Sequence, residues 1–440
     1  MKKRGLLAAV AAVLLLLSGC SMAEIDELYS LPQPSQEYLQ LQKLIDAEIA
    51  DGSEYSAPTA GSLRQSVQLT DLDGDGTDEA LAFLRNKDQQ AEVCIYRKTG
   101  GSYILADTIT GEGTAVGRVE YADLNGDGFS EIIISWEASS EMRILKAYSI
   151  KVWTTSVLLT ESCIDFQIAD LNGDGRADIL ALSLEQSGGK VDMYSLDSRN
   201  EVAQKIAKLS FSLKTADRFR IADIDNGVPA VFVEGQYSTE NSSCLLTDIF
   251  VFSGGELKNI TLNSDTGDSA TKRTFAVYST DVDGNGTLDV PSAQKLPFEP
   301  GGAPDYYIFD WYSYDSSGNK TLCASTYHCY TDGWYFTLPD GWKDKLLIRR
   351  ENTLSGEHAV VFSKRGSGGK ITDLLTIYTL TDENRTDRAK MGGRFILLSS
   401  ETVIYAAEIN SDQGEPGDAE KQDIVSRFHL IYSEWNTGDL

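Results

Sequence analysis

Acidic side chains recur at fixed positions in a nine-residue pattern that the chain repeats. The first copy, residues 71–79, reads Asp-Leu-Asp-Gly-Asp-Gly-Thr-Asp-Glu, with carboxylates at positions 1, 3, 5 and 9. Similar copies begin at Asp123, Asp170 and Asp281, and a copy that has lost this order begins at Asp223. Glycine at positions 4 and 6 lets the chain turn back on itself, because glycine adopts positive φ without a steric penalty. Such a loop gathers oxygen atoms around a hard cation.

The ligand chemistry of this pattern favours Ca²⁺. Oxygen ligands in a flexible loop suit Ca²⁺, which accepts six to eight of them, whereas Mg²⁺ requires a stricter octahedron. An EF-hand is excluded, because it needs Glu at position 12 and a helix on either side. Position 12 is instead Ala82, Ile134, Ala181 or Ser292, and strand-like sequence follows each loop. We therefore expect cation loops on a β framework.

The spacing of the copies predicts the fold. They begin 52, 47, 53 and 58 residues apart, and a period near 50 is typical of propeller blades. About four short apolar runs separated by turn residues fill each repeat, as in a four-stranded blade. The sequence predicts a mainly β chain, with a β-propeller of about five four-stranded blades over residues 60–330. Six or seven blades stay open if some have lost their loop. Residues 67–70 are predicted to close the ring by joining the last blade.

The loops resemble the FG-GAP and VCBS repeat families, which form β-propellers with Asp-x-Asp-x-Asp-Gly calcium loops. The resemblance covers about 270 residues and implies Ca²⁺ in a structural role, linking the strands of each blade at a turn. The implied ligands are Asp71, Asp73, Asp75 and Glu79; Asp123, Asn125, Asp127 and Glu131; Asp170, Asn172, Asp174 and Asp178; and Asp281, Asp283, Asn285 and Asp289. The copy at 223–231 has Gly227 at position 5 and Val231 at position 9, so we predict no ion there.

The start of the chain has the features of an export signal. Two lysines and an arginine precede an apolar run at 6–17, which is shorter than the ~20 residues that span a bilayer. The run ends in Leu-Ser-Gly-Cys, which resembles the bacterial lipobox and implies a diacylglycerol on Cys20. Two acyl chains anchor a protein stably. We expect residues 1–19 to be a lipoprotein signal peptide and the exported protein to be lipid-anchored to the outer face of the bacterial cell membrane. Residues 20–59 are predicted to be a tether and a short helix that begins after Ser35.

The C-terminal residues 331–440 contain no acidic loop of this kind. Strand-like runs and a closing helix predicted over 420–432 indicate a small α+β domain. The sequence Phe-Thr-Leu-Pro-Asp-Gly-Trp at 336–342 resembles the start of small PsbP-like domains found in exported proteins. The alternative is a cap that packs on the propeller without a role of its own.

The five cysteines after Cys20 cannot all pair within one chain, because their number is odd. Cys94, Cys163 and Cys244 lie in strand-like apolar runs and are predicted to be core residues. Cys323 and Cys329 have the option of a disulfide in an exported protein. The sequence leaves that pairing open.

Composition argues against some classes of function. The net charge of −27 excludes binding of nucleic acid through a general basic surface. Three His residues and the absence of a recognisable nucleophile motif predict no catalytic residue, and we do not expect an enzyme. The predicted function is a non-catalytic binding or scaffold module for an envelope protein or glycan, anchored to the membrane at Cys20. The alternative is an extracellular hydrolase of sugar or phosphoester substrates at the propeller face, which would need clustered carboxylates outside the ligand sets.

Overall fold

A computed structural model describes most of the chain. The described residues are 35–139, 142–185, 188–238, 240–241, 243–296, 306–366, 368–410 and 417–431. The predicted signal peptide and Cys20 therefore lie outside the described residues. Within the described ranges, no helix combines the length and the apolar character needed to cross a bilayer.

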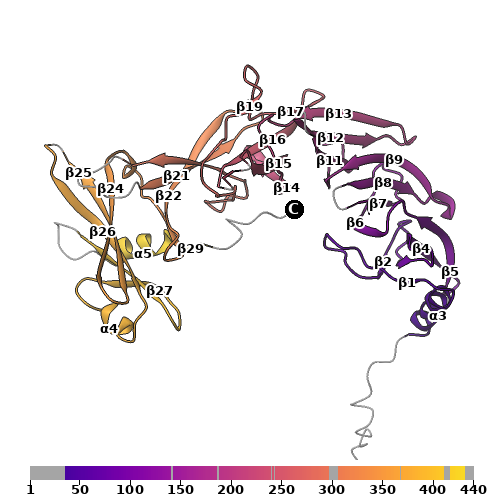
Figure 1. The fold of residues 1–440 in the computed structure, drawn as a ribbon, viewed down its shortest axis with the longest axis horizontal. Coiled ribbons are helices and arrows are strands. Elements are labelled where there is room, and N and C mark those ends of the chain that lie inside the picture. Colours follow the sequence, from indigo (N-terminus) through magenta and orange to yellow (C-terminus); the bar gives the residue numbers. More distant parts are fainter. Residues whose placement is uncertain are drawn as a thin grey trace, which may run out of the picture.

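The first element is helix α3 (Gln36–Ala50), where the sequence predicted one. The Ser35 side chain caps it by accepting a hydrogen bond from the Tyr38 backbone N–H at 3.4 Å. Leu41 and Ile45, one turn apart, are buried against the first sheet. The helix thus covers the outer face of that sheet (Figure 1).

Four antiparallel sheets follow in chain order. The first contains β1 (Glu54–Tyr55), β2 (Val67–Thr70), β3 (Glu79–Arg85), β4 (Ala91–Thr99) and β5 (Ser102–Thr110). The second contains β6 (Ala115–Ala122), β7 (Glu131–Glu137), β8 (Arg143–Ser149) and β9 (Ser156–Cys163). The third contains β10 (Asp165–Ala169), β11 (Asp178–Glu185), β12 (Gly188–Leu196) and β13 (Val202–Lys208). The fourth contains β14 (Arg218–Ile224), β15 (Val228–Gln236), β16 (Leu245–Ser253) and β17 (Glu256–Asn259).

The sheets stack face to face, which explains why their second strands are apolar throughout. Side chains alternate between the two faces of a strand. In β11, Ile179 packs towards the second sheet, whereas its neighbour Leu180 packs towards the fourth. Both are completely buried. The predicted mainly β, propeller-like architecture of four-stranded units is confirmed.

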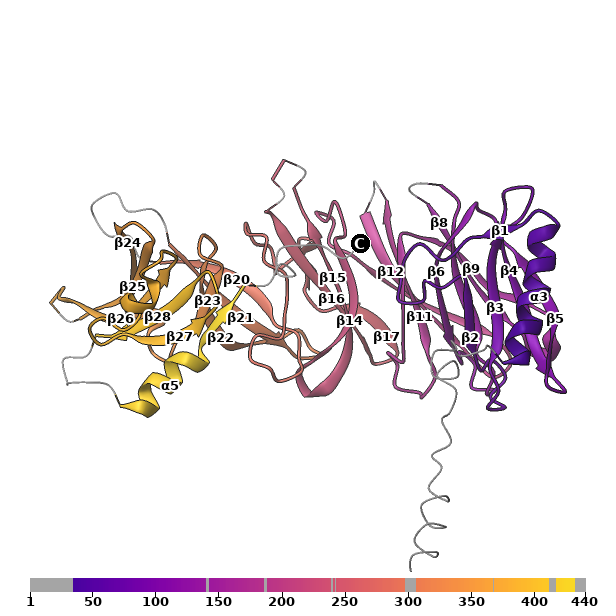
Figure 2. The ribbon, with the colours of Figure 1, turned by 90° about the horizontal axis from the view of Figure 1, so that it is seen from below.

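The stack forms an open arc instead of a closed ring. The first sheet and the C-terminal sheet lie at opposite ends of the long axis (Figures 1 and 2). The prediction that residues 67–70 join the last blade was wrong, because β2 pairs with β3 of its own sheet, from Val67 opposite Ala82 to Thr70 opposite Glu79. The first strand of the array is therefore used locally and does not link it to the last sheet.

A fifth sheet joins the array to the C-terminal region. It contains β20 (Val290–Lys295), β21 (Tyr307–Tyr314), β22 (Lys320–Cys329), β23 (Trp334–Thr337) and β29 (Phe428–Leu430). The short hairpin of β18 (Leu262–Asn263) and β19 (Asp268–Ser269) precedes it. The helix predicted over 420–432 is shorter than expected, because α5 (Asp418–Ser426) ends and Phe428–Leu430 pair with β23 as a strand. The last described strand thus closes the edge of the fifth sheet.

The C-terminal domain is the predicted small α+β unit. Its sheet has the order β24 (Leu346–Leu354), β25 (Glu357–Arg365), β26 (Ile371–Leu380), β28 (Ile404–Ile409) and β27 (Phe395–Ser399). The short helix α4 (Arg385–Arg388) and α5 accompany it. Trp334 and Phe336 of the fifth sheet share one core with Phe362 of this sheet, so the two sheets pack together.

All five described cysteines are free thiols. Cys94, Cys163, Cys244 and Cys329 are buried, whereas Cys323 is partly exposed. Cys323 and Cys329 therefore do not form the disulfide that the sequence left open.

Candidate metal centre

The acidic loops occupy one structural position, the turn between the first and second strands of a sheet. Loop one (71–79) connects β2 to β3, loop two (123–131) connects β6 to β7, and loop three (170–178) connects β10 to β11. Loop five (281–289) leads into β20, and a single bridge between Thr280 and Asp289 stands where a first strand would be. A cation in such a loop would tie together the two strands that it connects.

Loop one is held by hydrogen bonds from its own backbone. The Asp71 carboxylate accepts from the N–H groups of Gly74 and Gly76 at 2.8 and 2.9 Å. The Glu79 carboxylate, which is buried, accepts from the Leu72 N–H at 3.0 Å. Position 1 therefore fixes the turn, while position 9 closes the loop from the strand side.

Loops two, three and five repeat this pattern of hydrogen bonds. In each loop the position 1 carboxylate accepts from positions 4 and 6 at 2.7–3.0 Å. The position 9 carboxylate accepts from the N–H of position 2 at 2.9–3.1 Å. The position 9 residues Glu131, Asp178 and Asp289 are all buried. The shared backbone geometry follows from the shared spacing.

Neighbouring loops also contact each other. The Ser130 N–H in loop two donates to the Leu72 carbonyl in loop one at 2.8 Å. Gly74 has φ +74°, and a Cβ at this position would lie 2.8 Å from the Gly128 carbonyl oxygen. Glycine is therefore required there both by its backbone conformation and by the close approach of the next loop.

In loop one, carboxylate groups converge. Oxygens of Asp71, Asp73 and Glu79 lie within 4.8 Å of one another. Burial raises the pKa of Glu79 to about 7, and the adjacent aspartates at positions 1, 3 and 5 add to the shift. A divalent cation would offset both the burial and the repulsion, so these residues fit a Ca²⁺ site.

Loop two has Asn at position 3, and the N–H of its side-chain amide donates to a carboxylate that a cation would otherwise neutralise. The Asn125 Nδ2 donates to the Glu131 carboxylate at 3.3 Å and to the Asn200 side-chain oxygen at 2.7 Å. Burial still raises the pKa of Glu131 to about 7. The loop keeps its oxygen ligands, but the Glu131 carboxylate already accepts a hydrogen bond from the Asn125 amide.

Loop three is neutralised further by its own side chains. Asn172 Nδ2 and Ser195 Oγ donate to the buried Asp178 carboxylate at 3.1 and 2.5 Å. Arg176 pairs with Asp174 at 2.6 Å, and although burial acts in the opposite direction, this contact lowers the pKa of Asp174. Arg176 and Ser195 were not part of the predicted site. Only the fold brings Ser195 of β12 to the loop.

Loop five lies beside a potential metal ligand that the sequence did not predict, Cys323 on β22. Ligand atoms of Asp283, Asp289 and Cys323 lie within 4.8 Å of one another. Burial raises the pKa of Asp289 to about 6. Within the described part of the chain, groups of three such Asp, Glu, His or Cys side chains occur only here and in loop one.

The copy at 223–231 does not form a loop of this kind. Its residues continue β14 and β15, and Ile224 pairs directly with Val228 across a tight turn. Asn226 and Gly227 adopt positive φ in that turn. The Asp223 carbonyl instead accepts from the Leu288 N–H of loop five at 3.0 Å, so this copy supports the next loop.

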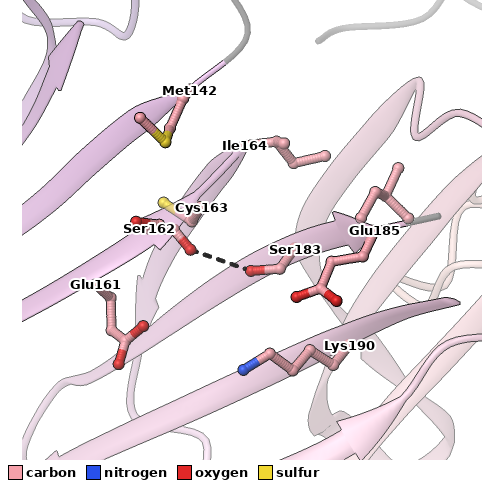
Figure 3. Close-up of a pocket in the computed structure, with 9 residues that line it drawn as sticks. Met142, Glu161, Ser162, Cys163, Ile164, Ser183, Glu185 and Lys190 are labelled. Atoms are coloured by element: carbon pink, nitrogen blue, oxygen red, sulfur yellow. Dashed lines mark hydrogen bonds between the residues drawn. The ribbon is translucent and has the colours of Figure 1, made fainter. Parts of the chain in front are cut away.

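Two pockets lie between the stacked sheets, away from the loops. One, of about 290 Å³, is lined by residues of β9, β11 and β12, including Glu161, Glu185 and Lys190 (Figure 3). Ser183 Oγ donates to the Ser162 carbonyl on its wall at 3.2 Å. The second, of about 460 Å³, shares Glu185 and Lys190 and adds the exposed side chain of Phe211. Because they share these two residues, we refer to both pockets together as the groove across the third sheet.

Comparisons with known proteins support the presence of the repeat but do not indicate a function. A sequence model of the FG-GAP-like repeat family matches residues 71–134, which include loops one and two. No curated protein matches the sequence. Among solved structures, the Bacillus licheniformis rhamnogalacturonan lyase PL11 aligns with a TM-score of 0.30 and 12% identity, covering 82% of this chain and 72% of that chain. A likeness at that TM-score supports no functional conclusion. Residues 71–134 are therefore similar to FG-GAP-like repeats, within a mainly β, propeller-like fold.

Proposed function

We propose that the protein is an exported, lipid-anchored module that binds an envelope protein or glycan and whose sheets are stabilised by Ca²⁺ in the acidic loops. The observation that supports this most strongly is the convergence of Asp71, Asp73 and Glu79 within 4.8 Å in loop one. Carboxylate and carbonyl oxygens are the ligands of Ca²⁺. Partners bind at the sheets. The ion stabilises the sheets and takes no part in catalysis.

Calcium would stabilise the array at its turns. In loop one it would neutralise a buried carboxylate that now faces three others. The hydrogen bond from the Ser130 N–H to the Leu72 carbonyl would then help to stabilise loop two as well. Extracellular sites of this kind bind Ca²⁺ with a dissociation constant of about 10⁻⁴–10⁻³ M, and free Ca²⁺ then stabilises the folded state by mass action.

Thermal unfolding of the full chain tests the calcium role. We expect a higher melting temperature in millimolar Ca²⁺ than in chelator, with Mg²⁺ giving a smaller increase. Asp73→Asn should reduce the calcium-dependent increase, while Asp78→Asn, an exposed change of equal charge in the same loop, should leave it intact. Identical melting curves in Ca²⁺ and chelator would overturn the proposal.

The groove across the third sheet is the surface we assign to the partner. Phe211 and Ile206 are 59% and 54% exposed there, beside the charged side chains of Glu185 and Lys190. Exposed apolar side chains with a polar rim mark interaction sites. In a pull-down from envelope fractions, Phe211→Ser should lose partners that the wild type retains. Phe211→Tyr is the matched control, and equal recovery by all three proteins would exclude this surface.

Anchoring is supported by the sequence around Cys20, which lies outside the described residues. Metabolic labelling with palmitate should mark the wild-type chain and leave Cys20→Ala unlabelled. Equal labelling of the two chains would rule out Cys20 as the acylated residue.

A hydrolase is the second candidate, favoured by one observation. Glu161 and Glu185 line the same pocket, outside every predicted ligand set. Glycosidases use a pair of carboxylates as acid and base or nucleophile. Hydrolysis of envelope glycans that disappears in both Glu161→Gln and Glu185→Gln would support this function. Activity that survives both changes would exclude the pair.

A further inference from the structure

Loop five differs from the other loops in the kind of atom that faces its buried carboxylate. Cys323 lies on β22, far along the sequence from the loop, yet its Sγ is within 4.8 Å of carboxylate oxygens of Asp283 and Asp289. In loop one the corresponding group consists of oxygen ligands alone. Sulfur is a poor ligand for Ca²⁺ and a good one for zinc and related metals.

A β-bulge places Cys323 at the loop. In the pairing of β21 with β22, Trp311 lies opposite Ala324 and Tyr312 lies opposite Leu322, so Cys323 is the extra residue. Bulges redirect a side chain and are common beside functional sites. Cys323 also lines a pocket of about 340 Å³.

The Asp289 carboxylate supplies a second, independent observation. The residue is completely buried, and its Oδ1 accepts no hydrogen bond from any described residue. The other oxygen accepts from the Val282 N–H at 3.1 Å. The Cys323 thiol lies beside this carboxylate. A buried carboxylate oxygen without a partner is costly, and a coordinated cation would remove that cost.

We propose that loop five binds a thiophilic divalent cation such as Zn²⁺ through Cys323 Sγ and the carboxylates of Asp283 and Asp289. Zn–S and Zn–O distances of about 2.3 and 2.1 Å place two ligand atoms of a tetrahedral site about 3.6 Å apart. The three groups, which lie within 4.8 Å of one another, therefore need to close by about 1.2 Å at most. On binding, the thiol releases its proton to solvent and the thiolate becomes a ligand, so two carboxylates and one thiolate face the ion. This assignment replaces the Ca²⁺ that the resemblance implied for loop five, and it is independent of calcium in the first three loops.

Metal titration of the full chain tests the assignment. Cd²⁺ serves as the probe, because a cadmium–thiolate bond gives an ultraviolet charge-transfer band. We expect one equivalent of this band in buffer saturated with Ca²⁺, and its loss in Cys323→Ser. Asp283→Asn, at an exposed position where misfolding is not expected, should weaken Zn²⁺ and Cd²⁺ binding at least tenfold, since even residues that only support a ligand cost 10–100-fold. Asp73→Asn in loop one is the matched control and should leave the band unchanged.

Alkylation gives a readout that does not depend on the metal spectrum. Zn²⁺ should protect Cys323 from iodoacetamide, as located by peptide mass mapping, whereas Ca²⁺ at the same free concentration should not. Protection by Ca²⁺ equal to that by Zn²⁺ would overturn the proposal. A full cadmium band in Cys323→Ser, or unchanged affinity in Asp283→Asn, would do the same.

Discussion

The first and fourth sheets each bury a glutamate, but they balance its charge in different ways. Glu79, beside loop one, faces other carboxylates, and burial raises its pKa to about 7. Glu234, on β15, is paired with Arg273 at 3.1 Å and Arg220 at 3.3 Å. It also accepts from the Ser279 N–H at 2.9 Å. The buried glutamate of the fourth sheet, whose acidic loop has decayed, is therefore neutralised by arginines of the chain, whereas we propose an ion from solution for the first sheet.

Replacing Arg273, one of the two arginines that pair with Glu234, should have the largest effect on stability. Arg273→Met leaves Glu234 buried beside fewer positive charges, and losing one partner of a buried pair costs about 3–5 kcal/mol. Urea unfolding should show this loss equally in Ca²⁺ and in chelator. Arg199→Met, which breaks only exposed ion pairs, should change stability by less than about 1 kcal/mol. A loss for Arg273→Met that depends on calcium would break the contrast between the two sheets.

Removing the charge of Glu79 should have the opposite dependence on calcium. Glu79→Gln keeps an oxygen for the Leu72 N–H but lowers the repulsion in loop one. In chelator we expect stability equal to or above that of the wild type. At free Ca²⁺ about 100 times the dissociation constant, the variant should lack about 2.7 kcal/mol of stabilisation. Calorimetry in both buffers measures the difference, and an unchanged calcium increment would remove Glu79 from the site.

The pH dependence of stability tests the same contrast at the fourth sheet. Burial by itself raises the pKa of Glu234, but Arg273 and Arg220 outweigh it and hold that pKa below its usual value. A carboxyl whose pKa is lowered by folding stabilises the fold at pH above about 4.3, its unfolded value, and this contribution is lost as pH falls through the folded pKa. Urea unfolding between about pH 5 and pH 2 should show this loss in the wild type and a flatter dependence in Glu234→Gln. Parallel curves would mean that the pair does not titrate with folding.

Loop three should show the smallest effect, because its internal cation is partly exposed. Arg176→Gln frees Asp174 for the ion. An exposed pair contributes about 0.2–1 kcal/mol, so calcium affinity at loop three should rise by no more than about fivefold. Titration calorimetry should detect this change, with Arg199→Gln as the control. A fall in affinity would show that Arg176 supports the loop instead of competing with calcium.

Local features of the sequence were predictive because their causes are local. The turn geometry of loops one, two, three and five follows from carboxylates and glycines that contact the backbone within nine residues. The cap at Ser35 and the apolar face of α3 act over one or two turns. The period near 50 residues and the four or so apolar runs in each repeat likewise indicated four-stranded β units. The mainly β, propeller-like class could therefore be predicted.

Contacts between distant residues were decided by the tertiary structure. Cys323 reaches loop five only through a bulge in β22, and Ser195 reaches loop three only because β12 folds back along β11. Phe428–Leu430 became a strand because β23 offered an unpaired edge, although its local pattern suits a helix. The pairing of Val67–Thr70 within the first sheet left the arc open. Spacing along the chain specifies which groups a loop can offer. Only packing determines which groups from other strands meet them, because those groups are distant in the sequence.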